Sequence, residues 1–176
     1  FHPLAIEKLI TFALSKKKFT ANDVFFHNER WHCFDVHSEL SHPDKEVLLQ
    51  NLNETLTVTR NYLKEATHCI ITLGTAWIYR YKKTGLHVAN CHKVPQKEFE
   101  KVLLSVEVIK KSLENITGMV KRLNPEISFI YTISPVRHLK DGFTENQVSK
   151  SHLISAIYKI QNAELIEENA FYFPSY

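Results

Sequence analysis

The stretch ISFIYTISPVRH, residues 127–138, contains the end of a buried strand. A run of strand character stops at Ser134 and Pro135, and an arginine and a histidine follow at once. Apolar and β-branched residues on consecutive positions are typical of a strand buried on both faces, as in a parallel sheet. Either a solvent-facing turn or the rim of a binding site would place Arg137 and His138 at this point.

The segments before this strand complete a crossover unit. Residues 96–123 carry an apolar stripe at helical spacing, which the following Asn-Pro pair ends. HCIITLGTAWIYRY, residues 68–81, begins with a buried strand that Gly74 interrupts, and residues 82–95 form an insertion with a hairpin at Thr84-Gly85. Strand, long helix and strand in this order predict a βαβ crossover in a parallel sheet.

The remaining patterns agree with an α/β protein. Helices are predicted over residues 3–15, within 42–66 and over 149–168, and Ser149 is the expected cap of the last one. Short strands or loops are expected at 24–27 and 31–34, and FYFPSY opens another strand. The predicted fold is a single domain over residues 1–176, a three-layer α/β/α sandwich with a mostly parallel sheet.

Composition excludes several classes of protein. Of the 176 residues, 44% are hydrophobic and 23% are charged, which is typical of a soluble globular domain. The net charge is only +3 and the densest basic run is Lys16 to Lys18, so no nucleic-acid partner is expected. No apolar run reaches the roughly 20 residues of a membrane span. The cytoplasm is the default expectation for localisation, and any export signal would precede residue 1.

The cysteines and glycines argue against two further features, a disulfide framework and a nucleotide-binding loop. The three cysteines are odd in number and widely spaced, which is not a disulfide framework. No glycine-rich phosphate loop occurs among the four glycines, so neither a P-loop nor a Rossmann nucleotide site is predicted. No cofactor is expected.

A candidate site lies where the two predicted strands end, because ligands of open parallel sheets bind beyond the carboxyl ends of the strands. After the first strand, a backbone amide near Gly74 and the hydroxyl of Thr75 would face a developing oxyanion, with Trp77 as a pocket wall. After the second, Arg137 and His138 would bind an anion or move a proton. From spacing alone, a simple turn is the favoured reading of each segment, and a binding site is the alternative.

The histidines and cysteines suggest an alternative site, one that binds a metal ion. They gather in two loops, one with His32, Cys33, His37 and His42 and the other with His87, Cys91 and His92. The pairs Cys33–His37 and His87–Cys91 have spacings seen in zinc sites, but neither contains the usual C-x₂-C. A zinc-stabilised module is one reading, and pocket-lining or surface residues are the other.

The segments ITLGTAWIYRY, VANCHKVPQKEF, YTISPVRHLKDGFTENQVSKSHL and YFPSY resemble the GSCFA family of bacterial proteins, which is related to the SGNH (GDSL-type) hydrolases. The resemblance covers nearly the whole chain. It implies a flavodoxin-like three-layer fold and hydrolysis of an ester, with an acylated carbohydrate or a lipid as the substrate. A serine would be the nucleophile, assisted by an Asp–His pair.

The resemblance assigns no catalytic triad residue to this chain. Neither a Gly-Ser-Cys-Phe-Ala sequence, which would hold the nucleophile, nor a D-x-x-H sequence occurs in it, and both are expected outside residues 1–176. The oxyanion side carries over: Gly74 matches the family's G-x-N segment, but Ala76 stands where asparagine is expected. Thr75 or the local backbone is the expected substitute donor. His37 and Ser38 are expected to line the same mouth, and Ala76 favours a non-catalytic binding domain as the alternative.

Overall fold

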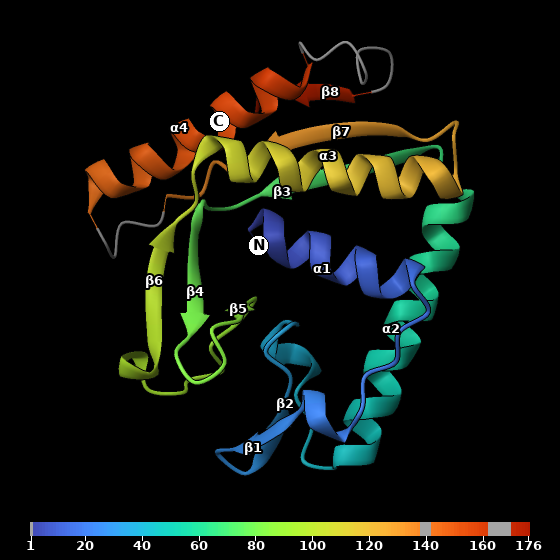
Figure 1. The fold of residues 1–176 in the computed structure, drawn as a ribbon, viewed down its shortest axis with the longest axis vertical. Helices are drawn as coiled ribbons and strands as arrows, with labels where there is room; N and C mark the ends of the chain where they lie inside the picture. Colours follow the sequence, from blue (N-terminus) through green and yellow to red (C-terminus); the bar gives the residue numbers. More distant parts are fainter. Residues whose placement is uncertain (1, 138–141, 162–169) are drawn as a thin grey trace.

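A computed structural model describes residues 2–137, 142–161 and 170–176 (Figure 1). His138 lies outside these described residues. In chain order the helices and strands are α1 (Pro3–Leu14), β1 (Phe25–His27), β2 (Arg30–His32), α2 (Lys45–Glu65), β3 (His68–Leu73), β4 (Trp77–Tyr81), β5 (His87–Val88), β6 (Phe99–Leu103), α3 (Val106–Leu123), β7 (Ser128–Ile133), α4 (Phe143–Gln161) and β8 (Ala170–Phe173).

The predicted parallel sheet is present and has the order β3–β7–β8. β3 and β7 are aligned from the pair His68–Ser128 to the pair Leu73–Ile133. α3 leads from the hairpin that follows β3 into β7, and α4 lies between β7 and β8 in the chain. The α/β class and the crossover helix between the two sequence-predicted strands are therefore confirmed.

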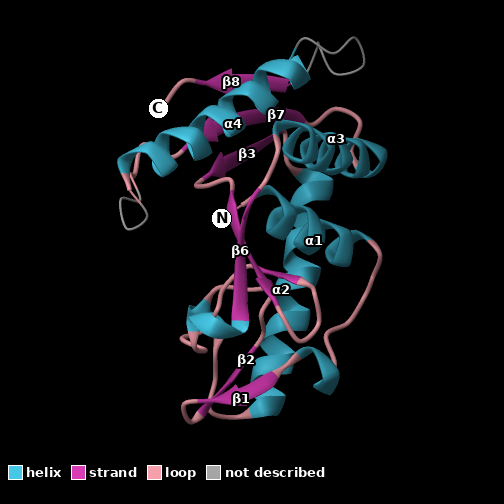
Figure 2. Cartoon of the chain, turned by 60° about the vertical axis from the view of Figure 1, so that its left-hand side comes forward, coloured by secondary structure: helices cyan, strands magenta, loops and turns pink. Residues whose placement is uncertain are grey.

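One face of this sheet forms the main core. Phe129, Tyr131 and Ile133 of β7 are buried there with Ile71 and Leu73 of β3. They pack in one cluster with the apolar stripes of α3 and α4, and Figure 2 shows these two helices beside the strands. Both crossover helices lie on the same face because the chain moves in one direction, from β3 to β7 to β8.

The opposite face of the sheet carries large apolar side chains that are accessible to solvent. Ile70 is 66% exposed, Phe171 52% and Phe173 62%. Ile70 and Phe171 are aligned through the same position of β7, Ile130, so they lie in one row across the sheet. Within the described part of the chain no helix is packed on this row, and the three-layer arrangement stays a prediction.

A second, antiparallel sheet has the order β5–β4–β6. Its central strand, β4, begins shortly after the end of β3 in the chain. The hairpin predicted at Thr84-Gly85 is confirmed, with Gly85 at φ 69°, a backbone conformation that favours glycine. The predicted start of the long helix at residue 96 is wrong, because residues 99–103 form β6 and α3 begins only at Val106. Pairing of β6 with β4, a distant segment, overrides the helical pattern, and Ser105 caps the shortened helix.

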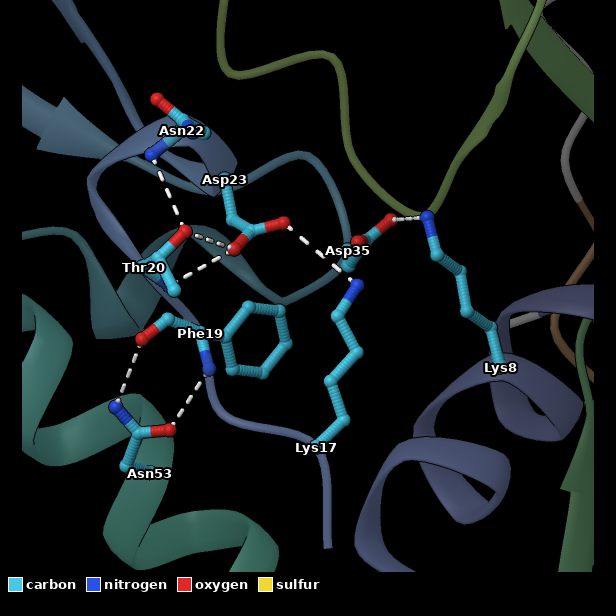
Figure 3. Close-up of polar contacts among 8 residues, drawn as sticks. All are labelled: Lys8, Lys17, Phe19, Thr20, Asn22, Asp23, Asp35 and Asn53. Carbon is cyan, nitrogen blue, oxygen red and sulfur yellow. Dashed lines mark hydrogen bonds and ion pairs between the residues drawn. The ribbon is translucent and has the colours of Figure 1, made fainter. Parts of the chain in front are cut away.

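The N-terminal third forms a smaller core between α1 and α2, and Figure 3 shows the polar contacts around Phe19, one of its members. Asn53 of α2 binds both backbone groups of Phe19, accepting from its N–H at 2.8 Å and donating to its carbonyl at 3.1 Å. Thr20 and Asp23 cap the short turn that follows, and Lys17 lies 3.8 Å from the Asp23 carboxylate. Asn53 thus fixes the lysine-rich connection to the helix.

The other predicted helices are present, with one shifted boundary. α1 and α2 begin close to their predicted starts, at Pro3 and just after the capping residue Asp44. α4 begins at Phe143, so the prediction that Ser149 caps this helix is wrong: Ser149 lies within it. None of the described helices is long and apolar enough to cross a membrane.

Candidate functional site

The carboxyl ends of β3 and β7 meet at one edge of the parallel sheet. The N–H of Ser134 donates to the carbonyl of Leu73 at 2.9 Å, so the residues following the two strands are neighbours. Trp77 donates from Nε1 to the carbonyl of Glu145 at 3.2 Å, and the Arg137 guanidinium lies 5.8 Å from the centre of the Phe143 ring. Both contacts are with the first turn of α4, so the structure brings Trp77 and Arg137 to the same edge.

Hydroxyl groups link the turn after β3 to α4. Ser149 Oγ accepts from the N–H of Ala76 at 2.8 Å and lies 3.1 Å from Thr75 Oγ1. Thr75 Oγ1 also accepts from the N–H of Trp77 at 3.0 Å. The Ala76 amide therefore already has a partner, and Thr75 and Ser149 form a short hydroxyl relay at the sheet edge.

A buried ammonium group ties the two strand ends together. Lys150 is 1% exposed, and its Nζ donates to the carbonyl of Gly74 at 2.8 Å and to that of Ser134 at 2.6 Å. It also lies 5.3 Å from the centre of the Tyr176 ring. No ion pair of Lys150 with a carboxylate occurs among the residues that the structure describes, and burial lowers the pKa of this group. The carbonyls at the ends of β3 and β7 therefore hold this ammonium group at the edge of the sheet.

The position of Lys150 in the sequence indicates that its side chain is buried, which the sequence analysis did not predict. Asn146, Ser149 and Lys150 are buried and stand in line, at helical spacing, with the buried Leu153. Polar residues at buried positions of an otherwise apolar stripe need specific partners. Here the partners lie at the ends of β3 and β7, which only the folded chain reveals.

The residues after β8 cover the end of β7. Ser175 Oγ donates to the carbonyl of Ile133 at 2.7 Å and contacts the hydroxyl of Thr132. The hydroxyl of Tyr176 contacts the side chain of Gln147 on α4. With Thr75, Ser149 and Lys150, these residues form a polar rim around the carboxyl edge.

His37 and Ser38 lie elsewhere. Ser38 begins the 3₁₀ turn Ser38–Leu40, and His37 caps it by accepting from the N–H of Glu39 at 3.3 Å. Figure 1 shows this segment, between β2 and α2, in the lower half of the view, apart from β7 and α4. The structure therefore does not bring these two residues to the edge that carries Gly74 and Thr75.

The histidines cluster, and both ring nitrogens of His32 bind protein groups, whereas His27 Nε2 and His92 Nδ1 are buried without a hydrogen-bond partner among the described residues. The rings of His32 and His92 have centres 4.8 Å apart. His32 bonds through Nδ1 to Ser41 Oγ at 2.7 Å and through Nε2 to the carbonyl of His27 at 2.9 Å. Burial raises the pKa of the Cys33 thiol to about 12, which disfavours a thiolate ligand.

No group of three or more His, Cys, Asp or Glu side chains in the described residues is arranged to hold a metal ion. The zinc alternative thus gains no support from this cluster.

Comparison with known proteins gives one match. The model of the GSCFA family matches residues 1–176. No curated protein and no solved structure matches the chain. The match includes the two strand ends, the Thr75–Ser149 relay and Lys150.

Proposed function

The chain belongs to the GSCFA family, and from this premise we propose that it is the hydrolase-like domain of an SGNH-type esterase acting on an acyl ester of a carbohydrate or lipid. The observation that supports this proposal best is the Thr75 hydroxyl, held at the carboxyl edge of a parallel sheet by Ser149 and the Trp77 amide. This edge is where open α/β sheets bind their ligands.

In the proposed arrangement Thr75 donates to the oxyanion. A hydroxyl has one proton to donate and two lone pairs that accept. Thr75 Oγ1 accepts from the Trp77 N–H, and the proposal assigns Ser149 as the donor of the second bond. Both lone pairs are then engaged, and the Thr75 proton remains for a substrate oxygen. Thr75 would replace the asparagine donor that the family resemblance leads one to expect at Ala76.

The reaction would follow acyl transfer through serine. A serine hydroxyl attacks the ester carbonyl and gives its proton to a histidine, and the carbonyl oxygen becomes an oxyanion held by Thr75. The carbon–oxygen bond to the alcohol then breaks, and the histidine returns the proton to the leaving alcohol. Water hydrolyses the acyl-serine by the same steps. The nucleophile and the Asp–His pair are assigned to no residue of this chain, and Arg137 would contact a polar group of the substrate.

One observation favours a binding domain without catalysis. Ala76 is fully buried and its side chain has no hydrogen-bond donor, while its amide is occupied by Ser149. A site that lost its asparagine donor could keep the fold and bind an ester without hydrolysing it. The two functions differ in turnover, which can be measured directly.

The test uses the full-length protein with p-nitrophenyl acetate and p-nitrophenyl butyrate. Thr75→Val removes the hydroxyl at nearly constant volume and is expected to lower kcat by about 10²–10³-fold, whereas Thr75→Ser retains most activity. Thr72→Val, an exposed position of β3, is the matched control and should leave kcat unchanged. Absence of turnover in the wild-type protein would support the binding domain. Full activity of Thr75→Val would remove Thr75 from the oxyanion site.

A further inference from the structure

The antiparallel sheet forms a pocket that is separate from the strand ends. It has a volume of about 370 Å³, within the range typical of small-ligand sites. Its walls include Tyr79, Val88 and Phe99 of the three strands. Asn90, Cys91 and Gln96 come from the connection between β5 and β6. This connection belongs to the segment VANCHKVPQKEF, which the esterase proposal does not use.

The walls combine apolar and neutral polar groups. The rings of Tyr79 and Phe99 pack edge to face, with centres 6.3 Å apart. Asn90 and Gln96 contribute amides, which both donate and accept hydrogen bonds. None of the described residues lining the pocket is charged, so an ionic ligand would find no counter-charge there. We propose that this pocket binds an uncharged pyranose, with an apolar ring face against the aromatic wall and hydroxyls on the amides.

The connection is held in a conformation that most side chains avoid. His92 and Lys93 have φ values of 48° and 60°, both in the left-handed region. The turn closes with a 2.9 Å bond from the Val94 N–H to the Cys91 carbonyl. The His92 ring is 3% exposed and fixed by a 2.7 Å bond to the Cys33 carbonyl. A buried anchor thus holds the pocket wall in shape before a ligand arrives.

The same anchor orients one ligand-binding amide. The N–H of His92 donates to Asn90 Oδ1 at 2.8 Å. Because Oδ1 has this partner, the amide orientation of Asn90 is fixed and its Nδ2 donors are left for a sugar hydroxyl. A fixed donor beside an aromatic wall is a preorganised site, which reduces the entropy lost on binding.

The pocket adjoins the candidate esterase edge. Trp77 and Tyr79 are two residues apart on β4, so they share a face about 7 Å apart along the strand. Trp77 contacts the first turn of α4 at the sheet edge. If the esterase proposal holds, and this step rests on it, the pocket would hold the carbohydrate part of the ester. Sugar binding itself does not depend on hydrolysis.

Cysteine labelling tests the proposal. Cys91 lines the pocket, whereas the half-buried Cys69 lies in β3 and serves as an internal reference. The full-length protein is alkylated with iodoacetamide at constant pH, and each site is quantified by mass spectrometry. At about 10 mM methyl β-D-glucopyranoside or N-acetylglucosamine, a Kd of about 1 mM would slow labelling of Cys91 about tenfold. Labelling of Cys69 should not change.

Variants and a second ligand make the test decisive. Gln96→Ala, at an exposed wall position, should reduce the protection of Cys91 at least threefold, and Gln50→Ala on α2 should not. No protection by either sugar at about 50 mM, a concentration that would reveal even weak binding, would overturn the proposal. Protection by phenol but not by the sugars would also overturn it. Neither readout requires ester turnover, so failure of the esterase proposal would be seen separately.

Discussion

The hydroxyl of Thr117 on α3 lies 2.6 Å from the hydroxyl of Tyr131 in the centre of β7. Thr117 also donates to the carbonyl of Leu113 at 2.9 Å, so its proton is already used and Tyr131 is the donor of the pair. Both residues are buried, and burial raises the pKa of the phenol. This bond joins the crossover helix to the middle strand inside the core.

The two partners are not equivalent, and their variants should show it. Thr117→Val leaves the Tyr131 hydroxyl buried without its acceptor and should lower the free energy of unfolding by about 1–3 kcal/mol. Tyr131→Phe removes the donor, while Thr117 keeps its bond to Leu113, so the loss should be about 1 kcal/mol. Urea unfolding of both variants checks this order. Equal losses would contradict the assigned direction of the bond.

Lys150→Met should destabilise the sheet edge. Methionine keeps the apolar length of the side chain, but the carbonyls of Gly74 and Ser134 lose a charged donor. The expected loss is about 1–3 kcal/mol in the free energy of unfolding. Lys159→Met is the matched control on the same helix, because its ion pair with Glu107 is exposed to solvent and should contribute little to stability. A stabilised Lys150→Met protein would mean that burying the ammonium costs more than its hydrogen bonds return.

Acid should destabilise the protein through two buried histidines. Burial lowers the pKa of His2 from 6.5 to about 4, and the same cause lowers that of His92 from 6.5 to about 4. The unfolded chain therefore binds more protons than the folded chain between these values. Stability is full above pH 6.5 and falls as the pH drops toward 4, by on the order of 2–3 kcal/mol for each histidine.

Urea titrations between pH 4 and 7 would measure this slope. His92→Gln keeps an amide donor near the Cys33 carbonyl but cannot titrate, so its stability should depend less on pH than that of the wild-type protein. An unchanged slope would show that His92 is not a source of the acid sensitivity.

Asn53→Ala should release the lysine-rich connection between α1 and α2 (Figure 3). The variant loses both bonds to the Phe19 backbone. Local opening should increase about tenfold, which corresponds to about 1.4 kcal/mol, and trypsin should cleave after Lys16 to Lys18 correspondingly faster. Cleavage in the exposed turn at Lys82 and Lys83 is the reference. An equal increase at both places would indicate general destabilisation instead.

The parallel core could be predicted from sequence because its signals are local. Residues 69–73 and 129–133 are continuously apolar or β-branched, and both runs lie in strands at the predicted positions. The apolar stripe on α3 predicted the presence of the crossover helix in the same way. Because parallel strands share a carboxyl edge, the meeting of Trp77 and Arg137 near α4 also followed from pattern alone.

The structural features that the sequence did not predict depend on contacts with residues far away in the chain. β6 is a strand because β4 pairs with it, and its own sequence continues the helical stripe. Ser149 looked like a helix cap because serine is common there, but its hydroxyl binds the turn after β3. The burial of Lys150 was missed for the same reason. A lysine in a helix is usually exposed, and only the carbonyls at two strand ends explain why this one is buried.

The row formed by Ile70 and Phe171, with Phe173 beside it, has a practical consequence for handling the isolated 176 residues. Each of these side chains is more than half exposed, and full burial of such a side chain is favourable by about 1.5–3 kcal/mol. The polypeptide should therefore adhere to hydrophobic chromatography resins and precipitate at modest ammonium sulfate concentrations. Mild detergent or a lower working concentration should keep it dispersed.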